Sequence, residues 1–164
     1  MAKNQELLRK AKVHVSVLKF LESKAWRVSP SVKEKYRSHE LQIKVFEYCY
    51  DFLYHFIRNH ESNSIVLTKK KYLKMFVHHL AEPALRNESL KILTELVMDN
   101  EVANKMLKDE DVSQLVFDSS LVSETLTTQL LGFFKVVIET DLGILKEREK
   151  LMIKKILKLV MDIL

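Results

Sequence analysis

The scarcity of turn-forming residues limits this chain to one class of fold. It contains two glycines and two prolines among 164 residues. Hairpin turns and phosphate-binding loops need unusual backbone angles, which glycine adopts more easily than any other residue. Apolar residues also recur at the three- and four-residue spacing of a helix over most of the chain. The sequence therefore predicts an all-helical protein.

The apolar spacing divides the chain into about eight or nine helices joined by short turns. The first helix is expected to end near Glu22 and to place Leu7 and Leu21 on one face. A central helix over residues 40–59 is apolar on more than one face. This pattern predicts that neighbouring helices cover it.

Polar residues follow the central helix and give a signal for a corner. Ser62 or Asn63 is expected to cap the short helix after this corner, because both side chains can accept hydrogen bonds from backbone N–H groups. Further along, Gly132 lies within an apolar helical pattern. We expect it to mark a close contact between two helices.

Residues 25–39 interrupt the helical spacing. They include Pro30 and several serines and lysines, which predicts a flexible loop. The length of the chain suits one domain, so residues 1–164 are interpreted as a single helical domain. Both ends of the chain have helix-like sequence, and we therefore expect it to be a fragment of a larger protein.

The order of the helices leaves two architectures open. Short turns and alternating helix lengths favour a right-handed stack of helix pairs, as in armadillo-like and HEAT-like solenoids. No repeat recurs at a fixed period, although most solenoids show one. A compact irregular helical bundle is therefore the alternative.

No residue pattern points to catalysis, a cofactor or a metal ion. His55 and His60 are five residues apart and His78 is adjacent to His79, whereas a helical zinc pair needs a spacing of four. Cys49 lies in the most apolar helix, where a buried, unreactive thiol is expected. A helical chain also lacks the strand-turn-helix elbow that exposes a catalytic serine. We expect no enzymatic activity, no bound cofactor and no metal site.

The chain has no sequence feature of a membrane span. No stretch approaches the roughly 20 consecutive apolar residues that cross a bilayer. The single cysteine cannot form an internal disulfide, which indicates a reducing compartment. We therefore expect a cytoplasmic location and no transmembrane segment in this chain.

Basic residues gather in the first half of the chain. Residues 1–82 hold 16 Lys and Arg against 8 Asp and Glu, whereas residues 83–164 hold 11 against 14. Such an excess suits a surface that meets an acidic partner. Nucleic acid is not expected, because Tyr72 and Phe76 have the spacing of a buried face rather than of an exposed stacking surface. A possible interaction surface comprises Arg9, Lys10, Lys69, Lys70, Lys71 and Lys74.

Two motifs resemble those of a known family. The first stretch, KNQELLRKAKVHVSVLKFLE, contains Asn4, Gln5 and Leu8; the second, FIRNHESNSIVL, contains Arg58 and Asn63. Together and in this order they resemble the ryanodine and inositol trisphosphate receptor homology domain. The resemblance covers about residues 3–80.

The resemblance implies a function without catalysis. It suggests a structural and regulatory solenoid in an intracellular calcium-release channel, on the cytosolic face of the endoplasmic reticulum. Its partners would be neighbouring domains or subunits of the channel. The alternative is an independent armadillo-like adaptor that binds a peptide or helix of another protein.

Inositol phosphate binding is not carried over from the family. The positions that supply basic residues to the family's ligand pocket hold Ala2, Lys3, His60, Glu61 and Ser62 here. Of these, only Lys3 keeps a full positive charge, and the Glu61 carboxylate would repel a phosphate. This chain by itself is therefore not expected to bind inositol phosphate.

Overall fold

The computed structural model describes residues 2–23, 34–98, 102, 132–133, 135–136, 154 and 157–158. Every element within this part of the chain is a helix, which confirms the all-helical prediction there. The helices are α1 (Ala2–Lys10), α2 (Val13–Glu22), α3 (Glu34–Ile57), α4 (Glu61–Leu67), α5 (Lys70–His79) and α6 (Arg86–Met98). The helices expected after residue 100 lie outside the described residues, apart from the few positions named above.

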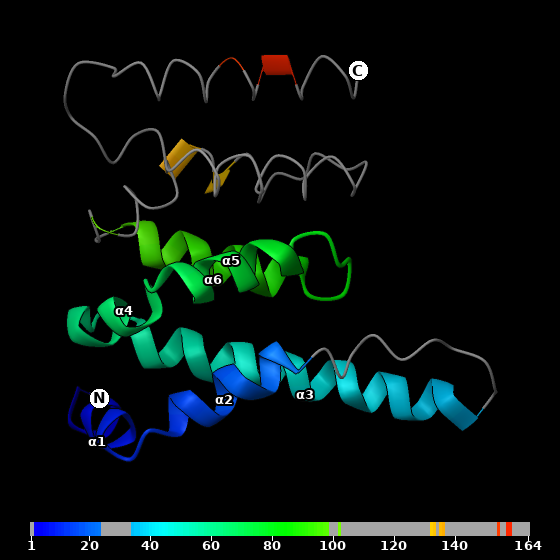
Figure 1. Ribbon diagram of the computed structural model, residues 1–164, viewed down its shortest axis with the longest axis horizontal. Coiled ribbons are helices and arrows are strands. Elements are labelled where there is room, and N and C mark those ends of the chain that lie inside the picture. The colour runs from blue at the N-terminus through cyan, green and yellow to red at the C-terminus, as the bar shows by residue number, and fades with distance from the viewer. Residues whose placement is uncertain are drawn as a thin grey trace.

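Helix α3 is the longest of these elements and lies at the centre of their arrangement. It packs against α2 on one side and against α6 on the other, and α5 packs on α6. Helix α1 leads into α2 and contacts both α3 and α4. The first turns of α3 extend beyond the other labelled helices (Figure 1).

The first predicted helix is divided in two. Lys12 adopts a left-handed backbone conformation with φ of 56°, and α2 starts at the next residue. The expected end near Glu22 is confirmed. The break changes which residues face the core: Leu21 is fully buried, whereas Leu7 is 63% exposed. Continuous apolar spacing could not reveal a break at a lysine, because such a residue seldom adopts positive φ.

The predicted loop over residues 25–39 was too long. Helix α3 begins at Glu34, so the last six residues of that range are helical, and residues 25–33 lie outside the described part. The serine and lysine content suggested a loop, but neither residue prevents a helix, and the proline that does discourage one is Pro30.

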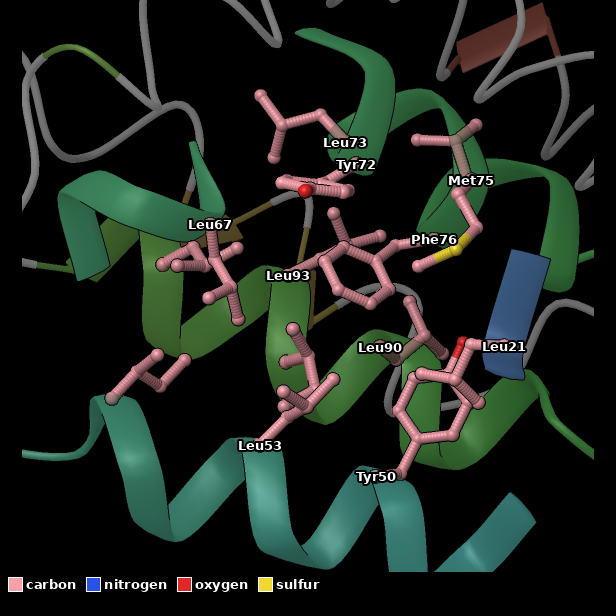
Figure 2. Packing of buried hydrophobic residues seen from close by; sticks show 14 of the residues in the cluster. Leu21, Tyr50, Leu53, Leu67, Tyr72, Leu73, Met75, Phe76, Leu90 and Leu93 are labelled. Carbon is pink, nitrogen blue, oxygen red and sulfur yellow. The ribbon is translucent and has the colours of Figure 1, made fainter. Parts of the chain in front are cut away.

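Apolar side chains from α2, α3, α5 and α6 form the core. Figure 2 shows Tyr50 and Leu53 of α3 directed toward residues of α5 and α6, including Phe76 and Leu93. These four side chains have no more than 1% of their surface exposed. The Tyr50 and Phe76 rings are tilted against each other with centroids 6.0 Å apart. The central position of α3 therefore results from burial of this face.

The hydroxyl groups of Tyr50 and Ser89 find partners inside this core. The Tyr50 hydroxyl lies 2.6 Å from Nδ1 of His79, and the Ser89 hydroxyl donates to the Phe76 carbonyl at 2.5 Å. Burial raises the pKa of Tyr50 far above its usual range, so its hydroxyl stays protonated. These bonds join α3 to α5 and α5 to α6, and they avoid the cost of burying an unpaired polar group.

The prediction that neighbours cover α3 on every apolar face was wrong. Leu41, Val45 and Tyr48 are 60%, 45% and 73% exposed. These residues are turned away from the core-facing residues Phe46 and Tyr50, both of which are fully buried. The apolar pattern correctly indicated two faces, but the described helices cover only one of them.

The expected close contact at Gly132 was also wrong. Gly132 is exposed, and a Cβ atom built there would have no neighbour within 4 Å. A larger residue would therefore fit at this position.

We predict that Leu53→Ala lowers the free energy of unfolding by about 2–5 kcal/mol, because it leaves a cavity among well-packed helices. Urea denaturation followed by circular dichroism would measure the change. The matched control is Ile65→Ala on α4, since Ile65 is 53% exposed. The control should shift the stability by no more than about 0.5 kcal/mol. Equal losses in the two variants would contradict the packing described for α3.

Candidate functional site

The chain turns at the C-terminal end of α3, between Ile57 and the start of α4 at Glu61. Asn59 adopts φ of 55°, and the backbone N–H of His60 donates to the Ile57 carbonyl at 2.9 Å. Asparagine tolerates this left-handed conformation better than most residues. The last carbonyl groups of a helix have no partners within it, so this end needs hydrogen-bond donors from elsewhere.

Gln5 of α1 supplies the first donor. Its Nε2 atom lies 2.7 Å from the His55 carbonyl oxygen and 3.0 Å from that of Arg58. It also lies 3.5 Å from the Phe56 carbonyl oxygen. One side-chain amide thus satisfies carbonyls from a segment some fifty positions away, and it holds α1 against the end of α3.

Asn63 of α4 supplies the second donor. It is fully buried, and its Nδ2 atom donates to the Phe56 carbonyl at 2.8 Å. The prediction that Ser62 or Asn63 caps α4 was wrong, because both residues lie inside that helix. The N-cap residue is His60, which makes no capping bond through its side chain. Asn63 satisfies the end of the preceding helix instead.

The structure therefore brings two of the predicted motif residues together. We call Gln5, Asn63 and the carbonyl groups of residues 55, 56 and 58 the α3 corner. Leu8, another motif residue, is half-buried and packs against the core. Asn4 is exposed, and the exposed Arg58 places its guanidinium 5.6 Å from the centroid of the Tyr54 ring.

His14 adds a feature that the sequence interpretation missed. It is only 5% exposed, and its ring stacks on that of Phe56 with centroids 5.0 Å apart. Its Nδ1 atom has no hydrogen-bond partner. Burial and the positive charges of Arg9 and Lys69 lower the pKa of His14. The sequence could have indicated that His14 is buried, because it precedes Leu18, a core residue, by one helical turn and so lies on the same face of α2.

The residues of the predicted basic surface lie on α1 and at the start of α5. Lys69, Lys70 and Lys71 are exposed at the start of α5, and Lys74 is half-buried one turn later. On α1, Lys10 is exposed and Arg9 is half-buried.

The positive charges of Arg9 and Lys69 both act on His14 and lower its pKa. Two other members of the surface have acidic neighbours. Nζ of Lys10 lies 2.9 Å from the Glu6 carboxylate, and Nζ of Lys71 lies 3.4 Å from that of Glu22. These pairs reduce the charge that the surface offers to a partner.

The thiol of Cys49, metal-binding groups and membrane-spanning helices are the other features to consider in the described residues. Cys49 is half-buried, and burial raises the pKa of its thiol, which makes the reactive thiolate scarcer at neutral pH. Among the described residues, no group of three or more His, Cys, Asp and Glu side chains could hold a metal ion. None of the helices described there is both long and apolar enough to cross a membrane.

Comparison with known proteins gives one match. The family model of the RIH domain matches residues 1–164, the whole chain. No curated protein and no solved structure matches it. Gln5 and Asn63, which form the α3 corner, both lie within the matched range.

We predict that Asn63→Asp destabilises the protein by about 2–4 kcal/mol, because it places an oxygen against the Phe56 carbonyl and removes the donor. Urea denaturation at neutral pH would measure the loss. Asn4→Asp makes the same chemical change at an exposed position and should cost less than about 0.5 kcal/mol. If the two variants have the same stability, the contact made by Asn63 does not hold the corner.

We also predict that stability falls as the solution becomes acidic, partly through His14. Its pKa in the folded protein lies below the ordinary value of 6.5. Above pH 6.5, His14 is neutral in both the folded and the unfolded protein. Below it the unfolded chain binds the proton first, so the free energy of unfolding decreases until the pH passes the lower folded pKa.

Denaturation between pH 8 and pH 5 would test this dependence. His14→Gln should flatten the fall in stability with pH, whatever its effect at pH 8. An unchanged slope in His14→Gln would show that protonation of His14 is not linked to folding.

Proposed function

Because this chain belongs to the RIH domain family, we propose that it is a structural and regulatory module of an intracellular calcium-release channel. The channel is of the inositol trisphosphate or ryanodine receptor type. The module has no catalytic role. It passes movement between neighbouring domains through protein contacts.

One observation carries this proposal beyond the family match. Amide groups from α1 and α4 bond to the carbonyl end of α3, which ties three helices together at one point. Without Asn63 the Phe56 carbonyl would lose its buried donor, and without Gln5 the exposed carbonyls of His55 and Arg58 would accept hydrogen bonds from water instead. A corner held in this way resists local bending, so a displacement at one end of the helices is transmitted as a movement of the whole unit.

The proposed architecture is a helical solenoid. The stack of α2, α3 and α6 supports it, because each helix contacts the next in a row. In such an array each unit contacts only its neighbours, and an extended surface is left for other domains.

We propose that residues 1–164 form one helical domain of a larger protein and that it lies in the cytoplasm, at the cytosolic face of the endoplasmic reticulum. A compact bundle would serve the same function with a smaller surface.

The basic residues are proposed to meet an acidic surface of a neighbouring domain or subunit. Lys69 is the exposed member for which the strongest contribution is expected. Inositol phosphate is not proposed as a ligand of this chain. Helix α4 begins at Glu61, an exposed carboxylate at one of the positions where the family's ligand pocket needs positive charge.

The first test is the size and fractionation of the native polypeptide. An antibody raised against this chain would be applied to detergent-free extracts of its source cells. We predict a band of several hundred kilodaltons that sediments with membranes and is released by detergent. Preincubating the antibody with the purified chain provides the control, since it should abolish the band. A small polypeptide in the supernatant would contradict the channel module and favour the armadillo-like adaptor.

A further inference from the structure

The uncovered apolar face of α3 has a regular spacing. Leu41, Val45, Tyr48 and Phe52 follow one another at intervals of four, three and four residues, and we call them the α3 seam. The first three are 60%, 45% and 73% exposed, and Phe52 is half-buried. Alternation of four and three is the heptad pattern by which two helices pack along a shared stripe.

Three residues of the α3 seam lie apart from the face that builds the core, whereas Phe52 also packs against that core. The core-facing residues Phe46, Tyr50, Leu53 and Ile57 have the same spacing and are at most 1% exposed. At 3.6 residues per turn, the two sets lie on different sides of the helix. A soluble helix with a second apolar stripe of this length normally has a partner along it.

We propose that the α3 seam binds the α3 seam of a second copy of this chain, with the two helices antiparallel. In heptad notation, Leu41 and Tyr48 are d positions, and Val45 and Phe52 are a positions. In an antiparallel pair, the a residues of one helix pack against the d residues of the other. Leu41 then meets the partner's Phe52, and Val45 meets the partner's Tyr48. The two-fold axis repeats both contacts, so the seam forms four complete layers and Tyr48 takes part in the central two.

The charges beside the seam select this direction. Lys44 and Asp51 occupy the same heptad position, each directly before an a residue, and both are exposed. In antiparallel coiled coils these positions face each other across the interface. Lys44 therefore lies opposite the partner's Asp51, and Asp51 lies opposite the partner's Lys44.

A parallel pair of α3 helices would leave both charges without an opposite charge on the partner. In a parallel pair, Lys44 would flank the partner's Cys49 and Asp51 would flank the partner's Phe56, so neither charge would find an opposite. Within one chain the Asp51 carboxylate lies 3.7 Å from Nζ of Lys91 and 3.6 Å from Nε2 of His55. Its side chain nevertheless keeps 55% of its surface exposed, which leaves it able to accept a further cation.

The interface is short, since it spans four layers of side chains. Interfaces at the small end of the stable range bind weakly, so we expect dissociation in the micromolar range. Sedimentation velocity of the purified chain over a concentration series would detect a monomer–dimer equilibrium of this strength. A chain that stays monomeric up to its solubility limit would overturn the proposal.

Charge reversal tests the direction of the pair. Lys44→Asp and Asp51→Lys each turn two attractive pairs into two repulsive ones, and each should weaken dimerisation by about tenfold or more. An equimolar mixture of the two variants restores opposite charges at both places and should dimerise as well as the wild type. A mixture no stronger than either variant alone would exclude the antiparallel arrangement.

An apolar substitution tests the seam itself. Tyr48→Ala removes the side chain that serves both central layers, and we expect at least a tenfold weaker dimer. Ile65→Ala on α4 removes another exposed apolar side chain outside the seam and should leave dimerisation unchanged. Both substitutions are at exposed positions, and circular dichroism would verify that the helices persist. A dimer unaffected by Tyr48→Ala would assign the contact to another surface.

Discussion

The last carbonyl groups of α3 impose the condition on which this corner of the structure depends. A helix cannot satisfy its own final acceptors, and here they lie close to the fully buried Asn63. Gln5 and Asn63 meet this need from two other helices. Helix α1, the turn at Asn59 and helix α4 therefore have their places set by one group of acceptors. At the same end of α3, the Phe56 ring stacks on the His14 ring.

A second constraint comes from the two apolar faces of α3. One face is closed by α5 and α6, and the hydroxyl of Tyr50 finds a partner there in His79. Burial of this face is large and favourable, so it determines where α3 lies. The other face, with Tyr48 exposed near the middle of the helix, contributes little to the fold of one chain. It can be used for association without weakening the core.

Electrostatics in the first half of the chain are more balanced than the composition implies. The excess of lysine and arginine is offset locally where Lys10 meets Glu6 and Lys71 meets Glu22. The positive charges that remain do not form one uniform patch. Arg9 and Lys69 act on the buried His14, where they disfavour a further positive charge. The basic residues thus take part in two separate effects, one at the surface and one at the buried His14.

The sequence by itself determined the helical class and the end of α2 near Glu22. These features follow from local rules, because the scarcity of glycine and proline and the apolar spacing act over neighbouring turns. The same rules placed the start of α3 too late and overlooked the left-handed Lys12. Neither boundary carries a strong local signal.

Only the tertiary structure decided what the motif residues bond to. Gln5 and Asn63 could have served their own helices, and local rules assigned Asn63 to the start of α4. Instead both donate to α3, and one of them is fifty positions distant in sequence from the carbonyl it meets. The physical reason is that an unsatisfied carbonyl accepts any well-placed donor, whatever its distance along the chain. Which donor arrives is settled by how the helices pack.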